Sequence, residues 1–536
     1  MPSVSVRLCR LSHFFAKKGG CHLFLVACAI GGVWAAVPDT LDAAFARFWA
    51  ARNPSEAARA APAIERSGAS FDEVYARLKR GRPYSKDVPT GIVTGRRGAF
   101  AYTIDVPATY DPSRQYQVRI HLHGGVMRDE TTPRPRGIGR LAGVDQIYVI
   151  PVGWSDAPWW SSAQLENLRA ILDTVKRTYN VDENHVVVSG VSDGGTGAYF
   201  VAMRDTTPYA SFLPLNGFAL VLQNDALNVQ GDLFPTNLRN KPLFVVNGGR
   251  DPLYPASGIE PYLDHLLHGG VSLTYKPQPQ AGHDTSWWPS IEDQFESFVR
   301  DHPRQPFPNR LTWETSDTRV SGRAHWVVID ALDSRPGDAR DLPDLNDYQP
   351  PAVIELGFRL GQGLRINRII GGSMADRVGL RTGDVIQKVG DTVITSTEVL
   401  VGALQGYKRI AARTDTPDTI RFTIERNDRV MELSGAFDPE EIRQPRTPVF
   451  KHHGRSGRID LVRNGNTIEA VTRGVSEFTL LLSPDQVDFG QPLRVLVNGR
   501  VAFEGRVEPS LATLLAWAAR DNDRTMLIGA ELKIKL

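Results

Sequence analysis

The chain has 536 residues, enough for three or four domains, and its ordinary content of hydrophobic residues (41%) allows large cores to form. Its formal net charge is +2 and its basic residues are scattered along the chain, so a nucleic acid is a poor candidate partner. All three cysteines lie within the first 28 residues, so the rest of the chain cannot form disulfides.

The first 36 residues have the pattern of a signal peptide. Four basic residues precede an apolar run at 23–36, which ends in Ala35 and Ala36 and contains no acidic side chain. The run is short for a membrane span, so we expect cleavage near Ala36 and no transmembrane segment in the mature chain. A cysteine-free exported protein is most simply a bacterial periplasmic one. The alternative is a lipid anchor at Cys28, because residues 25–28 resemble a lipoprotein cleavage site.

Residues 41–80 are rich in alanine, arginine, glutamate and aromatic residues at helical spacing. One predicted apolar face carries Phe45, Phe48 and Trp49, and a second lies within residues 71–78. We therefore expect residues 37–96 to form a helical extension that packs on the domain after it.

A strand predicted at 116–122 runs directly into His123, Gly124 and Gly125. Two glycines at this point let backbone N–H groups approach an oxyanion that develops during acyl transfer. The N–H of Asp193 would be the second donor, and each such donor stabilises a transition state by about 3 kcal/mol. His123 would line the substrate pocket.

The most informative motif is Gly-Val-Ser-Asp-Gly at 190–194, with Ser192 at its centre. A β-branched run precedes the motif and a predicted helix follows it, so the context is strand, sharp turn and helix. Glycines flank the serine because such a strained turn leaves no room for Cβ atoms on either side. This pattern predicts that Ser192 is a nucleophile.

An acid and a histidine follow two later strands. The strand predicted at 242–248 leads to Asp251, and the strand predicted at 272–276 precedes His283. Both residues lie just past the C-terminal end of a strand, where open α/β sheets place their sites. His283 would take the proton from Ser192, and Asp251 would hold the imidazole in its working tautomer.

Other readings of these residues remain open. Asp251 could simply cap a helix that begins near residue 254, and Asp284 or Asp156 could replace it as the acid. The motif could also persist in a protein that no longer turns over substrate. Four matching elements in the same order favour an active hydrolase.

With these motifs in place, residues 98–303 resemble the α/β-hydrolase esterases, especially polyhydroxybutyrate depolymerases, feruloyl esterases and prolyl-oligopeptidase-like hydrolases. The residues that carry the resemblance are 122–125, 190–195, 247–251 and 281–284. The chain order serine, acid, histidine is the order of that fold. The resemblance implies hydrolysis through a covalent acyl-enzyme, without a cofactor or a metal. It leaves the substrate open, because this fold hosts many acyl-transfer reactions.

Five of the ten tryptophans lie in loops near the predicted site. An aromatic wall there would suit an apolar acyl group, a phenolic ring or a sugar face. The alternative is that these rings pack the loops against the sheet. The residues concerned are Trp154, Trp159, Trp160, Trp287 and Trp288.

A second long motif, Ser-x-Ala-x-x-x-Gly-Leu-x-x-Gly-Asp-x-Ile, occupies residues 373–386. Over about 85 residues this region is similar to a bacterial-type PDZ domain, with a groove helix at 396–408 and a closing strand at 419–426. The resemblance implies that the C-terminus of a partner protein adds as a strand and places its carboxylate on backbone N–H groups. The alternative is a PDZ fold that only packs against its neighbours. The N–H donors implied are those of Leu356, Gly357 and Phe358.

Strand-like segments flank this region on both sides. Because a pair of short strands alone would be marginal, we predict that the two halves form one β-sandwich with the PDZ domain inserted in it. An amphipathic helix is predicted at 511–519. The predicted organisation is a leader at 1–36, the helical extension at 37–96, an α/β-hydrolase domain with a mostly parallel sheet and helices on both faces at 97–303, sandwich segments at 304–345 and 437–536, and the PDZ domain at 346–436.

Three functions follow from this organisation. The first is an exported serine hydrolase of carboxylic esters, whose PDZ domain binds protein C-termini or regulates access. The second keeps the same catalytic residues in a peptidase to which the PDZ domain presents substrates. The third is a binding scaffold whose hydrolase domain is catalytically idle.

Overall fold

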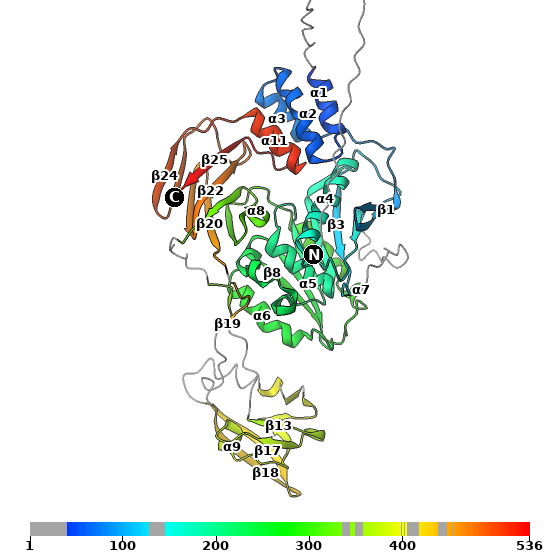
Figure 1. Cartoon of the computed structure of the whole chain (residues 1–536). Helices are drawn as coiled ribbons and strands as arrows, with labels where there is room; N and C mark the ends of the chain where they lie inside the picture. The colour runs from blue at the N-terminus through cyan, green and yellow to red at the C-terminus, as the bar shows by residue number, and fades with distance from the viewer. Residues whose placement is uncertain are drawn as a thin grey trace, which may run out of the picture.

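The computed structural model describes residues 40–127, 145–334, 343–348, 357–397, 399–400, 402–404, 418–437, 447–452 and 454–536 (Figure 1). The predicted leader, with its cleavage point near Ala36 and the alternative anchor at Cys28, lies outside the described residues, as does Leu356. No helix in the described part of the chain is long and apolar enough to cross a membrane.

The central domain is built on one eight-stranded sheet with the strand order β1-β2-β4-β3-β5-β6-β7-β8. Strands β3 to β8 run parallel to one another, whereas β1 and β2 pair antiparallel at one edge. The strands are β1 (Gly91–Arg97), β2 (Phe100–Val106), β3 (Tyr116–Leu122), β4 (Gln146–Pro151), β5 (Val181–Val191), β6 (Ser211–Leu215), β7 (Leu243–Gly248) and β8 (Leu273–Gln278).

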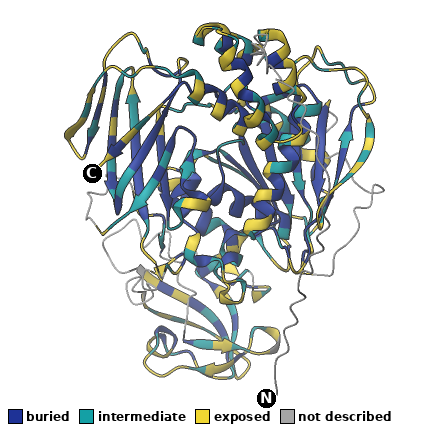
Figure 2. Ribbon diagram, turned by 45° about the horizontal axis from the view of Figure 1, so that its top comes forward, coloured by how far each residue is buried: buried dark blue, intermediate teal, exposed yellow. Residues whose placement is uncertain are grey.

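Helices cover both faces of this sheet because alternate residues of its strands are buried on opposite sides. Val186 and Val188 of β5 share a core with three helices, α4, α5 and α6, whereas Val187 shares a core with α7 on the other face. The strands are buried in Figure 2, while the outer sides of the helices are exposed. The helices are α4 (Ser162–Thr178), α5 (Asp193–Arg204), α6 (Ala256–His268) and α7 (Trp288–Asp301).

The sheet begins earlier than the sequence analysis placed it. All seven residues of β1 pair with β2, from Gly91 opposite Val106 to Arg97 opposite Phe100. The segment from Gly91 to Arg97 therefore belongs to the central domain, and the predicted boundary at residue 97 was wrong. Its alternating half-buried and exposed residues gave it a weak strand signal, which is typical of an edge strand.

The N-terminal segment forms three short helices, each started by a side chain that caps it. The cap residues Thr40, Asn53 and Ser70 each accept a hydrogen bond from a backbone N–H three residues later. The apolar faces of these helices pack on α11 (Leu511–Asp521), not on the central sheet as expected, and share one core with it. The helices are α1 (Leu41–Ala50), α2 (Pro54–Arg66) and α3 (Phe71–Arg80).

Two further sheets pack face to face beside the central domain. Their strand orders are β24-β23-β21-β20-β9 and β10-β11-β22-β25, so both contain strands from before residue 335 and after residue 454. Trp313, Ile459 and Phe478 lie in their shared core. The strands are β9 (Arg310–Thr315), β10 (Arg323–Ala324), β11 (Val327–Leu332), β20 (Gly457–Asn464), β21 (Thr467–Arg473), β22 (Val475–Leu482), β23 (Leu493–Val497), β24 (Arg500–Gly505) and β25 (Ala530–Lys535).

The free edge of β9 is closed by two asparagine side chains from the central domain. Asn237, in the 3-10 helix η4 (Pro235–Asn240), donates to the carbonyl of Glu314 at 2.9 Å and accepts from its N–H at 2.8 Å. Asn240 makes the same two contacts with Thr312. Thr312 and Glu314 are two residues apart on β9, so their backbone groups point to the same side, away from β20. The side-chain amides of Asn237 and Asn240 bond to these groups as the backbone of a neighbouring strand would.

A smaller module lies between the two halves of the sandwich in the sequence and has its own core, which contains Leu380, Ile386 and Phe422. Asp384 of the predicted motif is buried and receives two hydrogen bonds from Arg426, which ties the motif to β17. The module contains β13 (Phe358–Leu360), η5 (Gln362–Leu364), β14 (Ile366–Ile369), α9 (Met374–Val378), β15 (Val385–Val389), β16 (Thr392–Val393), β17 (Asp418–Arg426) and β18 (Arg429–Phe437).

The chain segments on either side of this module meet in a two-stranded neck on the central domain. Strand β12 (Asp347–Tyr348) pairs with β19 (Thr447–Pro448), and Tyr348 packs on Tyr262 and His265 of α6. The predicted boundaries at 346 and 436 assigned these two strands to different domains. The structure places both in the neck instead.

Candidate active site

Ser192 lies in a strained turn between β5 and α5. Its φ of 59° and ψ of −122° put a non-glycine residue in a region that L-residues rarely adopt. A Cβ at Gly190 would collide with the backbone of Gly194, and a Cβ at Gly194 would collide with the carbonyl of Leu122. The flanking glycines are therefore required by backbone contacts at this turn, as the motif predicted.

The structure brings Ser192, His283 and Asp251 together. His283 Nε2 lies 2.9 Å from Ser192 Oγ, and His283 Nδ1 lies 2.7 Å from Asp251 Oδ2. The His283 side chain is 23% exposed while that of Asp251 is fully buried, so a substrate can reach the imidazole but not the carboxylate. The arrangement can move a proton from the hydroxyl to the imidazole while the carboxylate stabilises the charge that forms.

Asp251 is held in place by its own turn. Its Oδ1 accepts hydrogen bonds from the N–H groups of Leu253 (2.8 Å) and Tyr254 (3.0 Å), which leaves Oδ2 for His283. Helix α6 begins only at Ala256, so Asp251 does not cap it. Of the two alternative acids, Asp284 bonds instead to Ser286, and Asp156 lies on an exposed turn.

The glycine loop after β3 lies directly against the serine. A Cβ at Gly124 would come within 2.9 Å of the Ser192 Cβ, and Gly125 has a φ of 72°. The N–H of Asp193 is in the first turn of α5, where backbone donors have no intrahelical acceptor. The backbone of Gly124 and the N–H of Asp193 therefore lie beside the serine, and Gly125 follows Gly124 in the same loop. These are the groups predicted to form an oxyanion hole.

The Asp193 side chain fixes the same loop. Its Oδ2 accepts a hydrogen bond of 2.9 Å from the backbone N–H of Val126. The residue after Ser192 is thus tied by its carboxylate to the loop that carries the two glycines. Sequence reasoning assigned Asp193 only a backbone role, because Val126 is 67 positions away in the chain and no local pattern links them.

His123, predicted to line the substrate pocket, is half-buried and supports this loop. Its Nε2 accepts a hydrogen bond from the Gly153 N–H at 3.0 Å, so Nδ1 carries the proton and donates it to the Gly124 carbonyl at 2.9 Å. Burial lowers the pKa of His123, which keeps this tautomer neutral. The carbonyl of His123 in turn accepts from Trp159 Nε1 at 2.7 Å.

The predicted aromatic wall is not open to solvent. All five rings are buried, with exposed fractions between 1% for Trp159 and 9% for Trp154, so the alternative of loop packing applies. Trp287 and Trp288 share a core with α7, and Trp160 belongs to the core of the central sheet. These tryptophans therefore contribute by burying the apolar area of their rings in the cores of the loops and the sheet.

An aromatic residue that the sequence analysis missed lies beside the imidazole. The Tyr254 ring is half-buried and meets the His283 ring edge-on, with the ring centroids 5.7 Å apart. Burial raises the pKa of Tyr254, and the charges of Asp193 and Asp251 add to this shift. The only sequence signal was its place three residues after the acid, which does not show which way the ring points.

At the predicted peptide groove, Gly357 and Phe358 are described. The carbonyl of Gly357 accepts from the Ile370 N–H at 2.6 Å, and Phe358 pairs with Ile369 across β13 and β14. Gly357 has a φ of 74° and lies against Ser373, where a Cβ would collide. Ser373, the first residue of the motif at 373–386, therefore leaves room only for a glycine at position 357. This requirement holds whether or not the groove binds a peptide.

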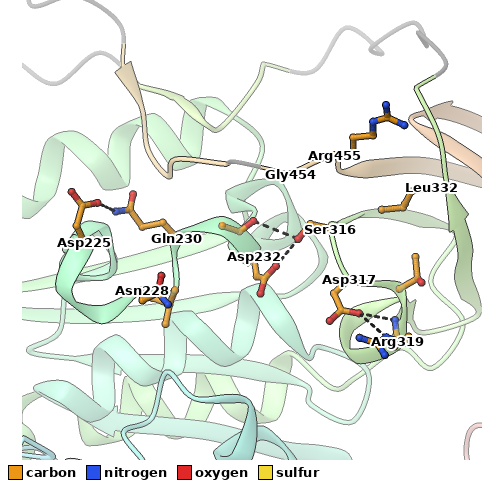
Figure 3. A pocket seen from close by; sticks show the side chains of 13 residues that line it. Asp225, Asn228, Gln230, Asp232, Ser316, Asp317, Arg319, Leu332, Gly454 and Arg455 are labelled. Carbon is orange, nitrogen blue, oxygen red and sulfur yellow. Dashed lines mark hydrogen bonds and ion pairs between the residues drawn. The ribbon is translucent and has the colours of Figure 1, made fainter.

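A cavity of about 800 Å³ lies away from the serine, between the loop around the 3-10 helices η2 (Asp225–Leu227) and η3 (Gln230–Asp232) and the short helix α8 (Thr318–Ser321) (Figure 3). Polar side chains line it, and several already bond to one another, as Ser316 does to Asp232. In the described parts of the chain, no cluster of three or more histidine, cysteine or acidic side chains is placed to hold a metal ion.

The geometry defines the class of the central domain. A mostly parallel sheet of this strand order, a strained serine turn after its central strand, and the chain order serine, aspartate, histidine are together those of the α/β-hydrolases. The central domain therefore has an α/β-hydrolase fold, as predicted for this region.

The known proteins that resemble this chain and are named below each match 40% of it or less. A scan against models of protein families finds no match. Among curated proteins the chain is similar to a probable feruloyl esterase C from Aspergillus terreus, at 24% identity over 198 residues, which are 34% of this chain and 67% of that protein.

Two solved structures are also similar to this chain. A thermostable esterase has a TM-score of 0.31 and 18% identity, over 40% of this chain and 62% of its own length, so less than two thirds of it is matched. Esterase 2 of Thermogutta terrifontis with bound butyrate has a TM-score of 0.33 and 14% identity, over 39% of this chain and 94% of that one.

The tie between Asp193 and Val126 can be tested by substitution. We expect Asp193→Ala to lower kcat for a p-nitrophenyl ester by about 10-fold with little change in KM, because the loop donors lose their fixed position. Asp193→Asn keeps an acceptor and should retain most of the activity. Asp156→Ala is the matched control on an exposed turn. Full activity of Asp193→Ala would contradict this role.

Proposed function

We propose that this protein is a serine hydrolase of carboxylic esters. The observation that carries the proposal is the pair of hydrogen bonds that His283 makes, at 2.9 Å to the Ser192 hydroxyl and at 2.7 Å to the Asp251 carboxylate. A serine hydroxyl becomes a nucleophile when an adjacent base takes its proton and a third group orients that base.

The reaction follows from the positions of these atoms. Ser192 Oγ attacks the ester carbonyl carbon while His283 Nε2 takes the hydroxyl proton. The negative charge that forms on the carbonyl oxygen faces the backbone N–H groups of Asp193 and of the Gly124–Gly125 loop. Collapse of this intermediate breaks the ester bond, and His283 gives its proton to the departing alcohol. A water then attacks the acyl-enzyme by the same route and releases the acid.

The comparisons favour an ester over a peptide bond. The probable feruloyl esterase C and the solved structures that resemble this chain carry the name esterase. A peptidase uses the same three side chains, so the bond that is cut must be settled by the choice of substrate.

Replacement of the serine is the direct test of the proposal. We expect the mature chain to hydrolyse p-nitrophenyl acetate or butyrate, and Ser192→Ala to lower kcat by about 10⁴-fold or more, because the nucleophile is lost. A fluorophosphonate should label the wild-type chain and not the variant. Ser290→Ala, on an exposed position of α7, is the control.

Each other outcome has a distinct meaning. Ester turnover that survives in Ser192→Ala would refute the assignment of the nucleophile. Labelling without ester turnover, but with cleavage of peptide p-nitroanilides, would identify a peptidase. Neither labelling nor turnover would identify an idle binding scaffold.

The smaller module is proposed to be a PDZ domain that recruits protein C-termini or regulates access to the site. Its support is the sequence motif, a core separate from that of the central domain, and attachment through one neck. A domain attached in this way can bind a partner without support from the catalytic core.

A shortened chain tests whether catalysis needs the module. Tyr348 and Thr447 are direct cross-strand partners, so an Asn-Gly turn can replace residues 349–446. Turnover of a small ester should stay within about twofold of the full chain, because independent domains fold separately. A large loss of turnover with an unchanged melting temperature would show that the module supports the active site.

Export to the bacterial periplasm is also proposed, on the basis of the basic and apolar leader and the absence of cysteine after Cys28. The mature chain recovered from a periplasmic extract should begin near Val37. Retention of the leader in a cytoplasmic fraction would contradict export, and a lipid on Cys28 would establish the alternative anchor.

A further inference from the structure

A second cavity, of about 630 Å³, lies where several parts of the chain meet. Its walls come from the loop between α1 and α2, from α4 and the segment before β6, from α8 to β11, and from the end of α11, with Arg97 of β1 and Arg304 after α7. Its volume is in the range of sites for small organic ligands, which are about 300–1,000 Å³.

This cavity is separate from the proposed active site. Lys176 is near the end of α4, which leads into β5, and Thr207 and Pro208 lead into β6, so this part of the cavity faces the N-terminal ends of the parallel strands. Arg97, which pairs with Phe100 at the start of β2, extends the lining toward the other edge, but neither Ser192 nor His283 is among the lining residues. Ser192 and His283 follow the C-terminal ends of β5 and β8, at the opposite edge of the sheet. A ligand in the cavity therefore cannot be the acyl group attached to the serine.

Positive charge exceeds negative charge in the lining, with eight arginine or lysine side chains against five aspartate or glutamate side chains. Arg323 donates two hydrogen bonds, of 2.7 and 2.8 Å, to the carboxylate of Asp521. Arg304 and Lys176 share the single carboxylate of Asp523. The carboxylates of Asp521 and Asp523 are thus paired with these three cations. Some other cations of the lining have no carboxylate partner among the described residues.

Arg520 is the clearest cation without a counterion. It forms no ion pair with any residue that the structure describes, and its guanidinium lies 4.6 Å from the centroid of the Trp517 ring. Arg323 lies 4.4 Å from the same ring. Burial lowers the pKa of Arg520, and the positive charges of Arg323 and Arg169 lower it further, while the negative charges of Asp521 and Glu531 oppose this shift.

The rest of the lining is mixed, with polar side chains such as Asn53 and Thr207 beside apolar ones. Leu172, Val320, Val328 and Met526 face the cavity beside the charged groups. We propose that the cavity binds an amphipathic organic anion, with its apolar body on these side chains and its carboxylate, sulfonate or phosphate group on Arg520. The planar fork of a guanidinium matches the oxygens of such a group.

Such a ligand would touch the helical extension, the central domain and the sandwich at once. Anything that binds only the assembled form raises its stability in proportion to the logarithm of its concentration over Kd. The site would therefore couple the ligand to the way in which these three parts are held together.

The test uses the mature chain with Ser192 blocked by a fluorophosphonate, so that the catalytic site is closed to the probe. The probe is 8-anilinonaphthalene-1-sulfonate, with neutral N-phenyl-1-naphthylamine as its uncharged counterpart. We expect one sulfonate probe per chain, with a rise in melting temperature, and at least about 10-fold weaker binding in Arg520→Gln, which removes the charged contact. Arg506→Gln, on an exposed part of the sandwich, should bind as the wild type does.

Three results would overturn the proposal: Arg520→Gln binding the sulfonate as tightly as the wild type, the neutral probe binding equally well, or Arg506→Gln losing as much affinity as Arg520→Gln. If Arg520→Gln does not fold, Arg520→Met decides, because it keeps the length of the side chain and removes its charge. Weaker sulfonate binding in that variant supports the site, and unchanged binding refutes it. The readouts are probe binding and melting temperature rather than ester hydrolysis, and only the blocking of Ser192 rests on the proposed function.

Discussion

The structure depends on a backbone contact that only glycine permits. Gly194, at the start of α5, lies so close to the carbonyl of Leu122 that any side chain there would collide with the end of β3. This approach holds the serine turn and the Gly124 loop against each other, with Ser192 strained between them at a φ of 59°. The buried sheet supplies the stability that maintains this strain, so the fold and the proposed chemistry share one constraint.

The parts that the sequence predicted are those that short motifs encode. The serine turn, the acid and the histidine each follow a strand within a few residues, so local patterns located Ser192, Asp251 and His283 before the structure brought them together. The α/β-hydrolase fold then followed from their order. The binding of protein C-termini by the smaller module and the export of the chain remain predictions. Both rest on sequence motifs alone.

The parts that were missed depend on contacts between residues far apart in the chain. The partner of the N-terminal helices is α11, more than 400 residues later, and the amphipathic pattern of a helix does not name the surface that it covers. The tryptophans near the site are aromatic whether they pack or bind, and only their burial separates the two roles. Asn237 and Asn240 resemble ordinary loop residues until β9 lies beside them.

The pairing of β9 with β20 carries a consequence for synthesis. These strands join residues 310–315 to residues 457–464, and β25 closes the second sheet with residues 530–535. A ribosome therefore releases β9, β10 and β11 long before their neighbours exist, and the sandwich assembles only after translation has reached the final strand. Contacts of such long sequence separation form slowly. Until then the early strands of the nascent chain lack their neighbours, which leaves them open to mispairing with other chains.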